Sequence, residues 1–66
     1  MGKLMRILRD SVVKTSNDET AMLPGGTIVM LLDTMIDVKN GSEYYSVYAP
    51  SFKQRYIVPP DVMVNI

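Results

Sequence analysis

The residue types that carry most enzyme chemistry are scarce in this chain. It contains no histidine and no cysteine, so the commonest general base, the commonest metal ligand and the thiolate nucleophile are all missing. A serine or lysine nucleophile needs an activating partner, and no motif supplies one. Gly25-Gly26 lacks the lysine and the helix of a phosphate-binding loop. The sequence therefore predicts a protein that is not an enzyme and that uses no cofactor.

One pair of acidic residues has a spacing that could serve acid–base chemistry or bind a hard cation. Asp33 and Asp37 are four residues apart and share a face if they lie on one strand. Paired carboxylates can do either task, but a cation needs further oxygen ligands, and the pattern supplies none. A solvated strand edge is the favoured interpretation, and we predict no metal site.

The tyrosines form the best candidate site. In the alternating segment 43–49, Tyr44 and Tyr48 fall on one face. The next expected strand presents Lys53, Arg55 and Ile57 outward. Tyrosine suits interfaces because it carries a large apolar area and a hydroxyl group. We expect these five residues to bind a partner; the alternative is that the tyrosines merely cover the surface of the sheet.

These residues depend on strands, because β-branched and aromatic residues dominate the chain and Gly and Pro punctuate it. The sequence predicts an all-β fold, a small five-stranded barrel closed or nearly closed on itself. The expected strands are a first one starting within 4–13, then 27–38, 43–49, 52–58 and 63–66. We expect an exposed loop at 15–20, a tight turn at Asn40-Gly41, and one short helical turn near residues 59–62.

Residues 20–66 carry three motifs in a characteristic order. Met22-Leu23-Pro24-Gly25-Gly26-Thr27-Ile28 is a turn leading into an apolar strand, and Tyr44-Tyr45 opens the next strand. Val58-Pro59-Pro60-Asp61-Val62-Met63 then precedes the last strand. In this order and spacing the chain resembles the Src homology 3 (SH3) fold. The resemblance implies a single SH3-like domain over residues 1–66, with residues 15–20 in the long first loop of the family.

Peptide-binding members of that family dock proline-rich helices between aromatic side chains. Pro59 of that motif is retained, so it joins the expected partner-binding residues. Tyr44 stands where the family has Trp, and Val62 stands where it has an aromatic residue. Ile57 lies where an aromatic residue often lines the groove. We therefore expect weak binding of polyproline peptides.

Composition narrows the class of partner. The 66 residues allow one domain, 47% of them are apolar, and the formal net charge is zero. Neutral charge argues against a dedicated binder of nucleic acids or anionic membranes. The charge is uneven, because basic residues gather near the N-terminus with only Asp10 to offset them: Lys3, Arg6, Arg9 and Lys14.

The six methionines are also informative. Met22, Met30 and Met63 sit in apolar patterns and are predicted to lie in the core, while Met1 and Met5 are expected to fray. Met35 is predicted at the surface, where its adaptable side chain suits a partner. No segment resembles a signal peptide or a membrane span, so we expect a cytoplasmic protein without membrane contact.

The leading hypothesis is a small protein-binding module: an adaptor, an accessory subunit, or an inhibitor or regulator of a larger protein. Regulators of this size include those that viruses make to bind host enzymes. One alternative is a nucleic-acid-binding barrel, with tyrosines stacking on bases and Lys or Arg contacting phosphates. Another is a structural homo-oligomer, for which short edge strands and spare apolar surface would serve.

Overall fold

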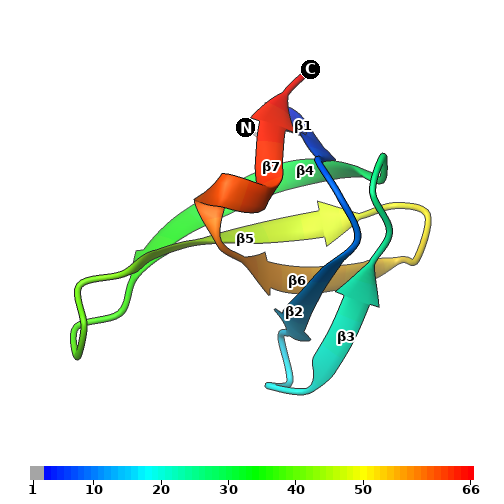
Figure 1. Ribbon diagram of the computed structural model, residues 1–66. Helices are drawn as coiled ribbons and strands as arrows, with labels where there is room; N and C mark the ends of the chain where they lie inside the picture. The colour runs from blue at the N-terminus through cyan, green and yellow to red at the C-terminus, as the bar shows by residue number, and fades with distance from the viewer. Residues whose placement is uncertain (1–2) are drawn as a thin grey trace.

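The computed structural model describes residues 3–66, and its architecture is all-β (Figure 1). Its strands are β1 (Lys3–Ile7), β2 (Ser11–Thr15), β3 (Thr20–Leu23), β4 (Ile28–Ile36), β5 (Glu43–Ala49), β6 (Gln54–Val58) and β7 (Met63–Asn65). A single 3₁₀ turn, η1 (Pro60–Val62), joins β6 to β7 and confirms the short helical turn expected there. Pro59 precedes this turn in extended conformation, as the fixed φ of proline favours.

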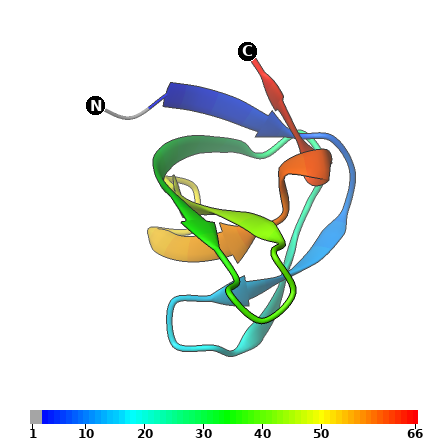
Figure 2. The ribbon, with the colours of Figure 1, turned by 90° about the vertical axis from the view of Figure 1, so that its left-hand side faces the viewer.

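The seven strands form one antiparallel sheet in the order β3-β2-β6-β5-β4-β1-β7. The sheet curls strongly, so that β1 and β7 lie on one side of the molecule and the β2–β3 hairpin on the opposite side (Figure 2). In the part of the chain that the structure describes, β3 and β7 do not pair with each other, and the sheet is open at both edges.

The core lies inside this curl and follows the alternation of the strands. The largest fully buried side chains come from five different strands: Ile7, Leu23, Val29, Val47 and Val58. Burial of β-branched and leucine side chains is worth about 1.5–3 kcal/mol each relative to exposure. The chain has no cysteine, so this small core must supply most of the stability.

A β-bulge divides the long strand β4. Leu31 pairs with Val47 and Asp33 pairs with Ser46, so Leu32 is an extra residue with no partner on β5. The extra residue shifts the alternation by one. As a result Met30 and Met35, five residues apart, lie on the same face of the sheet.

The structure has seven strands where the sequence predicts five. Three strands, β1 to β3, lie in residues 3–23, where one strand and an exposed loop are expected. The chain breaks after β1, where the Asp10 carboxylate accepts a hydrogen bond from the Gly25 N–H at 2.7 Å. This contact joins residues fifteen apart in sequence. A Cβ on Gly25 would lie 2.9 Å from the Arg9 Cα, so the close approach also requires glycine.

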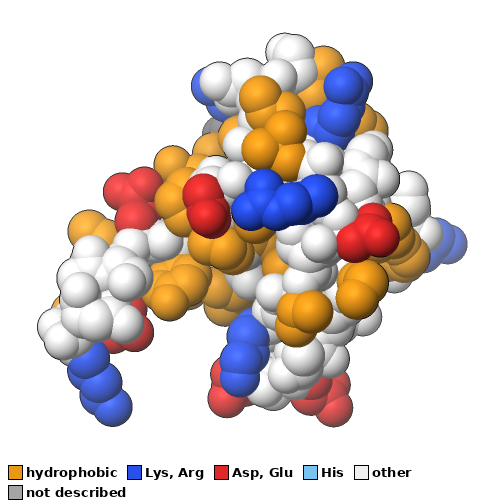
Figure 3. Space-filling model, in the orientation of Figure 1, with side chains coloured by type: hydrophobic (Ala, Val, Ile, Leu, Met, Phe, Trp, Pro, Cys, Tyr) orange, Lys and Arg blue, Asp and Glu red, His pale blue; other side chains and the backbone are white. Residues whose placement is uncertain are grey.

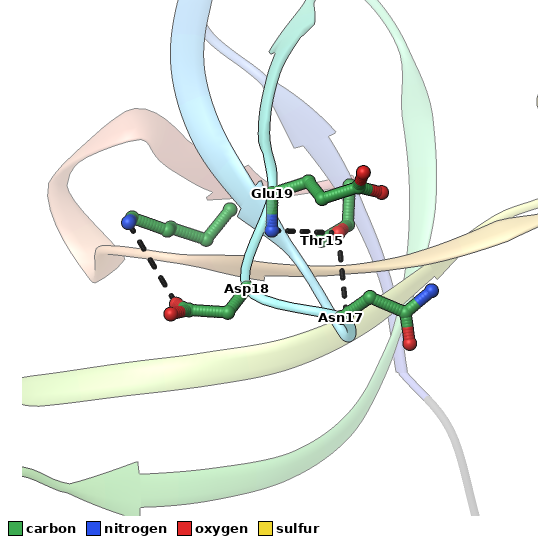
Figure 4. A network of polar contacts seen from close by, with 5 residues as sticks. Thr15, Asn17, Asp18 and Glu19 are labelled. Atoms are coloured by element: carbon green, nitrogen blue, oxygen red, sulfur yellow. Dashed lines mark hydrogen bonds and ion pairs between the residues drawn. The ribbon is translucent and has the colours of Figure 1, made fainter.

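The β2–β3 turn contains the polar residues expected in an exposed loop, but that loop is shorter than predicted. Thr15 ends β2 and its side chain is buried. Its hydroxyl oxygen accepts hydrogen bonds from the N–H groups of Asn17 and Glu19, both at 3.2 Å (Figure 4). Asp18 takes the left-handed conformation with φ 65°, which aspartate tolerates better than most residues. Thr20 then begins β3.

The expected tight turn at Asn40-Gly41 is a longer loop. Strand β4 ends at Ile36 and β5 begins at Glu43. Gly41 has the positive φ expected of it, 72°, whereas Asn40 does not share that conformation. The Asp37 N–H donates to the Ser42 carbonyl at 2.8 Å and closes the base of the loop.

The observed burial of the methionines differs from the predicted core. Met63 is buried as expected, but Met22 and Met30 are exposed, with Met22 at 58% of its full exposure. Met5, expected to fray, is buried in β1 as part of the core, and Met1 lies outside the described residues. Among residues 3–66 no helix is long and apolar enough to cross a membrane.

Candidate partner-binding face

The two faces of β5 have opposite environments, as the alternation predicts. Val47 and Ala49 point into the core and are fully buried. Tyr44, Ser46 and Tyr48 alternate with them and point to the outer side of the sheet, where they are half-buried. The rest of the candidate site is built around these outward side chains.

Tyr48 lies in a row of side chains that crosses four strands. It is opposite Met30 on β4 and opposite Arg55 on β6. Met30 is in turn opposite Leu4 on β1. Directly opposed residues in adjacent strands share a face and have Cβ atoms about 5 Å apart. The row Leu4, Met30, Tyr48 and Arg55 is therefore a continuous outer strip.

A second row lies beside the first. Ser46 is opposite Asp33 on β4 and Ile57 on β6, and Ile57 is opposite Lys14 on β2. Beyond this row, Tyr44 is opposite Met35. We call the outward side chains of six residues in these rows the tyrosine face: Leu4, Met30, Tyr44, Tyr48, Arg55 and Ile57.

Four of the six expected site residues come together on the tyrosine face: Tyr44, Tyr48, Arg55 and Ile57. Lys53 does not lie on the strand as predicted. It belongs to the turn between β5 and β6, has φ 52°, and is exposed. Pro59 lies one step beyond the Tyr45–Val58 pair, at the end of the sheet where Tyr44 also lies. Lys53 and Pro59 thus mark opposite ends of β6.

Sequence reasoning missed two residues of this face, Leu4 and Met30. Leu4 is 51% exposed and Met30 is 37% exposed, although both types are expected in cores. Met30 lies in the apolar run 28–32, which gives no sign of which side chains point outward. The pairing of β4 with β5 places Met30 beside Tyr48, and the pairing of β1 with β4 places Leu4 beside Met30. No local pattern contains that information.

Figure 3 shows apolar side chains at the surface over the β2–β3 hairpin and beside β4 and β5, with charged side chains between them. Within residues 3–66, exposed large apolar residues occur on every strand except β5 and β6, and in several loops. The pair Val12 and Met22 on the hairpin is exposed too, and these two residues are opposite each other. The tyrosine face differs from this pair because it combines apolar, aromatic and cationic side chains.

Most charged side chains on and around the tyrosine face form no ion pair within the described residues. In the described part of the chain, the one ion pair joins Lys14 to Asp18 at 3.7 Å, and both side chains are mostly exposed (Figure 4). Such a pair contributes about 0–1 kcal/mol. Neither Arg6 nor Arg55 has an acidic group within ion-pair distance among residues 3–66.

Two aspartate side chains instead accept hydrogen bonds from backbone N–H groups. Asp33 accepts the Thr34 N–H at 2.8 Å, and Asp37 accepts the Lys39 N–H at 2.9 Å. Within the described residues no group of three potential ligands is placed to hold a metal ion. No pocket is found in the same part of the molecule.

Among residues 3–66, Tyr45 is the group whose pKa is clearly shifted. Its neighbour Glu43 lies two residues earlier on β5 and so shares its side of the strand. A hydrogen bond to the Glu43 carboxylate, together with its negative charge, raises the pKa of Tyr45 above the ordinary 10.0. Tyr45 packs at the margin of the core and lies outside the tyrosine face.

Comparison with family models, with curated proteins and with solved structures finds no match to this chain.

Proposed function

We propose that the chain is a small, non-catalytic protein-binding module that binds its partner through the tyrosine face. The observation that carries this proposal is the row Leu4, Met30, Tyr48 and Arg55, which sets apolar, aromatic and guanidinium groups side by side in the open. Tyrosine and arginine are enriched among the residues that dominate binding energy at protein interfaces. A strand-based face is also held rigid, so little entropy is lost on binding.

We further propose that the domain is an SH3-like barrel. Three features support this. The turn Pro24–Gly26 leads into the apolar strand β4, Tyr44-Tyr45 opens β5, and the proline motif after Val58 forms η1 before β7. Strands β1, β4, β5, β6 and β7 fall in the five segments where strands are expected, and under this proposal the β2–β3 hairpin corresponds to the long first loop of the family. Because such barrels serve many tasks, the function rests on the face rather than on the fold.

The groove expected of polyproline binders has little support from these residues. Val62, at the position where an aromatic residue is expected, is buried. The Leu8 N–H donates to the Val62 carbonyl at 2.8 Å, which ties η1 to the segment after β1. We therefore place the proposed contact on the outer strip around Tyr48 rather than between Tyr44 and η1.

The proposal is tested by affinity capture from a cell lysate with the immobilised chain, read by mass spectrometry with and without nuclease. Wild type is compared with Tyr44→Ala/Tyr48→Ala. A protein captured by wild type in stoichiometric amount, resistant to nuclease and lost in the variant, is the expected result.

The matched control is Val12→Ala/Met22→Ala, which removes two exposed apolar side chains from the β2–β3 hairpin. It should capture the same protein as wild type. Capture that disappears with nuclease would support nucleic-acid binding instead. A chain that captures only itself, with a mass that rises with concentration, would support the homo-oligomer.

A further inference from the structure

The tyrosine face has a charge pattern that selects among protein partners. On β1, Leu4 and Arg6 both point outward, because Met5 and Ile7 between and after them are buried. Arg6 lies opposite Ile28 on β4 and opposite Val64 on the edge strand β7. The apolar strip is thus bordered by Arg6 at one side and by Arg55 at the other.

Neither guanidinium is neutralised within the described residues, where the Lys14–Asp18 ion pair lies elsewhere. Asp33 lies one row from the strip, opposite Ser46, and its carboxylate accepts the Thr34 N–H. An arginine that lacks an internal partner keeps its fork of five donors free for a carboxylate. The two arginines therefore favour a ligand that is anionic at both ends and apolar between them.

The width of the strip sets the length of a peptide that reaches both of its ends. Leu4 and Arg55 are three strand spacings apart, which at ~4.8 Å each is about 14 Å along the sheet. An extended peptide covers that span in about four or five residues at ~3.3 Å each. A helix needs about ten residues at ~1.5 Å each.

We propose that the tyrosine face, together with Arg6, binds an acidic protein segment that has apolar side chains flanked by carboxylates. This inference rests on the proposed protein-binding function and adds the chemistry of the partner. In the complex, apolar side chains cover Leu4 and Met30 and pack against the Tyr48 ring. Carboxylates pair with Arg6 and Arg55, and Lys53 in the adjacent turn adds positive charge.

The same residues favour a protein over a nucleic acid. A nucleic acid is gripped by many phosphate contacts, and the whole chain has no net positive charge. Base stacking needs aromatic rings in succession, whereas Tyr48 is flanked along its row by aliphatic and thioether side chains on one side. Within the strip, Arg55 and the neighbouring Arg6 suit carboxylates, and the Tyr48 ring beside Met30 and Leu4 suits apolar side chains.

The test uses a displayed library of random 16-residue peptides, selected separately on the wild-type chain and on Arg6→Glu/Arg55→Glu. Wild type is expected to enrich peptides in which Asp or Glu flanks apolar residues. The reversed variant should enrich peptides with Lys or Arg in those places. A synthetic peptide selected on wild type should bind Arg6→Glu/Arg55→Glu about tenfold or more weakly, because two attractive ion pairs become repulsive.

Two further variants serve as controls for folding and for net charge. Arg6→Gln/Arg55→Gln should lose the acidic preference without gaining a basic one, which separates charge from folding. Arg9→Glu/Lys39→Glu makes the same change of net charge away from the face and should leave the acidic preference intact. Chemical shifts of the labelled chain on titration with the winning peptide should map to Leu4, Met30, Tyr48 and Arg55.

Peptides selected without acidic residues, or shifts that map elsewhere, would overturn this inference while leaving protein binding in place. Tighter binding of a twelve-nucleotide thymidine oligomer than of any selected peptide would also overturn it, in favour of nucleic acid. If the chain selects no peptide and captures no lysate protein, both this inference and the proposed function fail.

Discussion

The packing of β3 is tested by comparing two neighbouring residues with opposite environments. Leu23 is fully buried, whereas Met22 is 58% exposed on the other face of the same strand. Leu23→Ala removes core side-chain volume and leaves a cavity, so it should destabilise the fold by about 3 kcal/mol. Met22→Ala removes a solvated side chain and should change stability by less than about 0.5 kcal/mol.

That loss is large for a chain of 66 residues, whose expected stability is roughly 3–10 kcal/mol at ~0.05–0.15 kcal/mol per residue. A destabilisation of about 3 kcal/mol should lower Tm by about 12–24 °C in a domain of this size. The assay is urea unfolding followed by far-UV circular dichroism and by tyrosine fluorescence, since the chain has no tryptophan.

Two results would refute this description of β3. Equally small effects would mean that the β2–β3 hairpin does not pack on the core in solution. A large effect of Met22→Ala with a small effect of Leu23→Ala would mean that the strand is shifted by one residue, which moves every side chain to the other face.

Three further outcomes are expected. Gly25→Ala should cost about 1–3 kcal/mol, because its Cβ would meet the Arg9 backbone at 2.9 Å; a variant as stable as wild type in urea would contradict this contact. Thr15→Ala should cost about 1–2 kcal/mol, while Thr15→Ser, which keeps the hydroxyl acceptor, should recover most of it in the same assay. Glu43→Gln should lower the raised pKa of Tyr45 toward 10.0 in an ultraviolet titration. The pKa of Tyr45 is higher in the folded chain than in the unfolded chain, so its contribution to stability is present below pH 10 and is lost as pH rises through the folded pKa. The free energy of unfolding of wild type should therefore fall more in that range than that of Glu43→Gln. Identical alkaline profiles of the two proteins would contradict the Tyr45–Glu43 interaction.

Sequence reasoning succeeded where the pattern is local. Strand β5 has the predicted bounds, and its alternation correctly assigned Tyr44 and Tyr48 to the outer face and Val47 to the core. The same period of two placed Arg55 and Ile57 on that side of β6. The period of two is reliable here because β5 and β6 bury alternate side chains in the core: Val47 and Ala49 on β5, and Tyr56 and Val58 on β6.

Sequence reasoning failed where distant segments decide the outcome. The break between β1 and β2 is accompanied by the Asp10–Gly25 hydrogen bond. Met30 joins the face because β4 pairs with β5, and Leu4 joins it because β1 pairs with β4. The bulge at Leu32 resets the alternation of β4 and cannot be seen in a continuous apolar run. Lys53 left the predicted face because the turn before β6 places it in the left-handed conformation.

The most direct test of the proposed function is site-specific photo-crosslinking in a lysate. A benzoylphenylalanine replaces Tyr48 in one protein and Met22 in another; both positions are on outward faces, but only the first lies on the tyrosine face. We expect a nuclease-resistant protein adduct of defined mass from position 48 and none from position 22. Adducts from position 22 alone, nucleic-acid adducts, or no adduct from position 48 would contradict binding of a protein through this face.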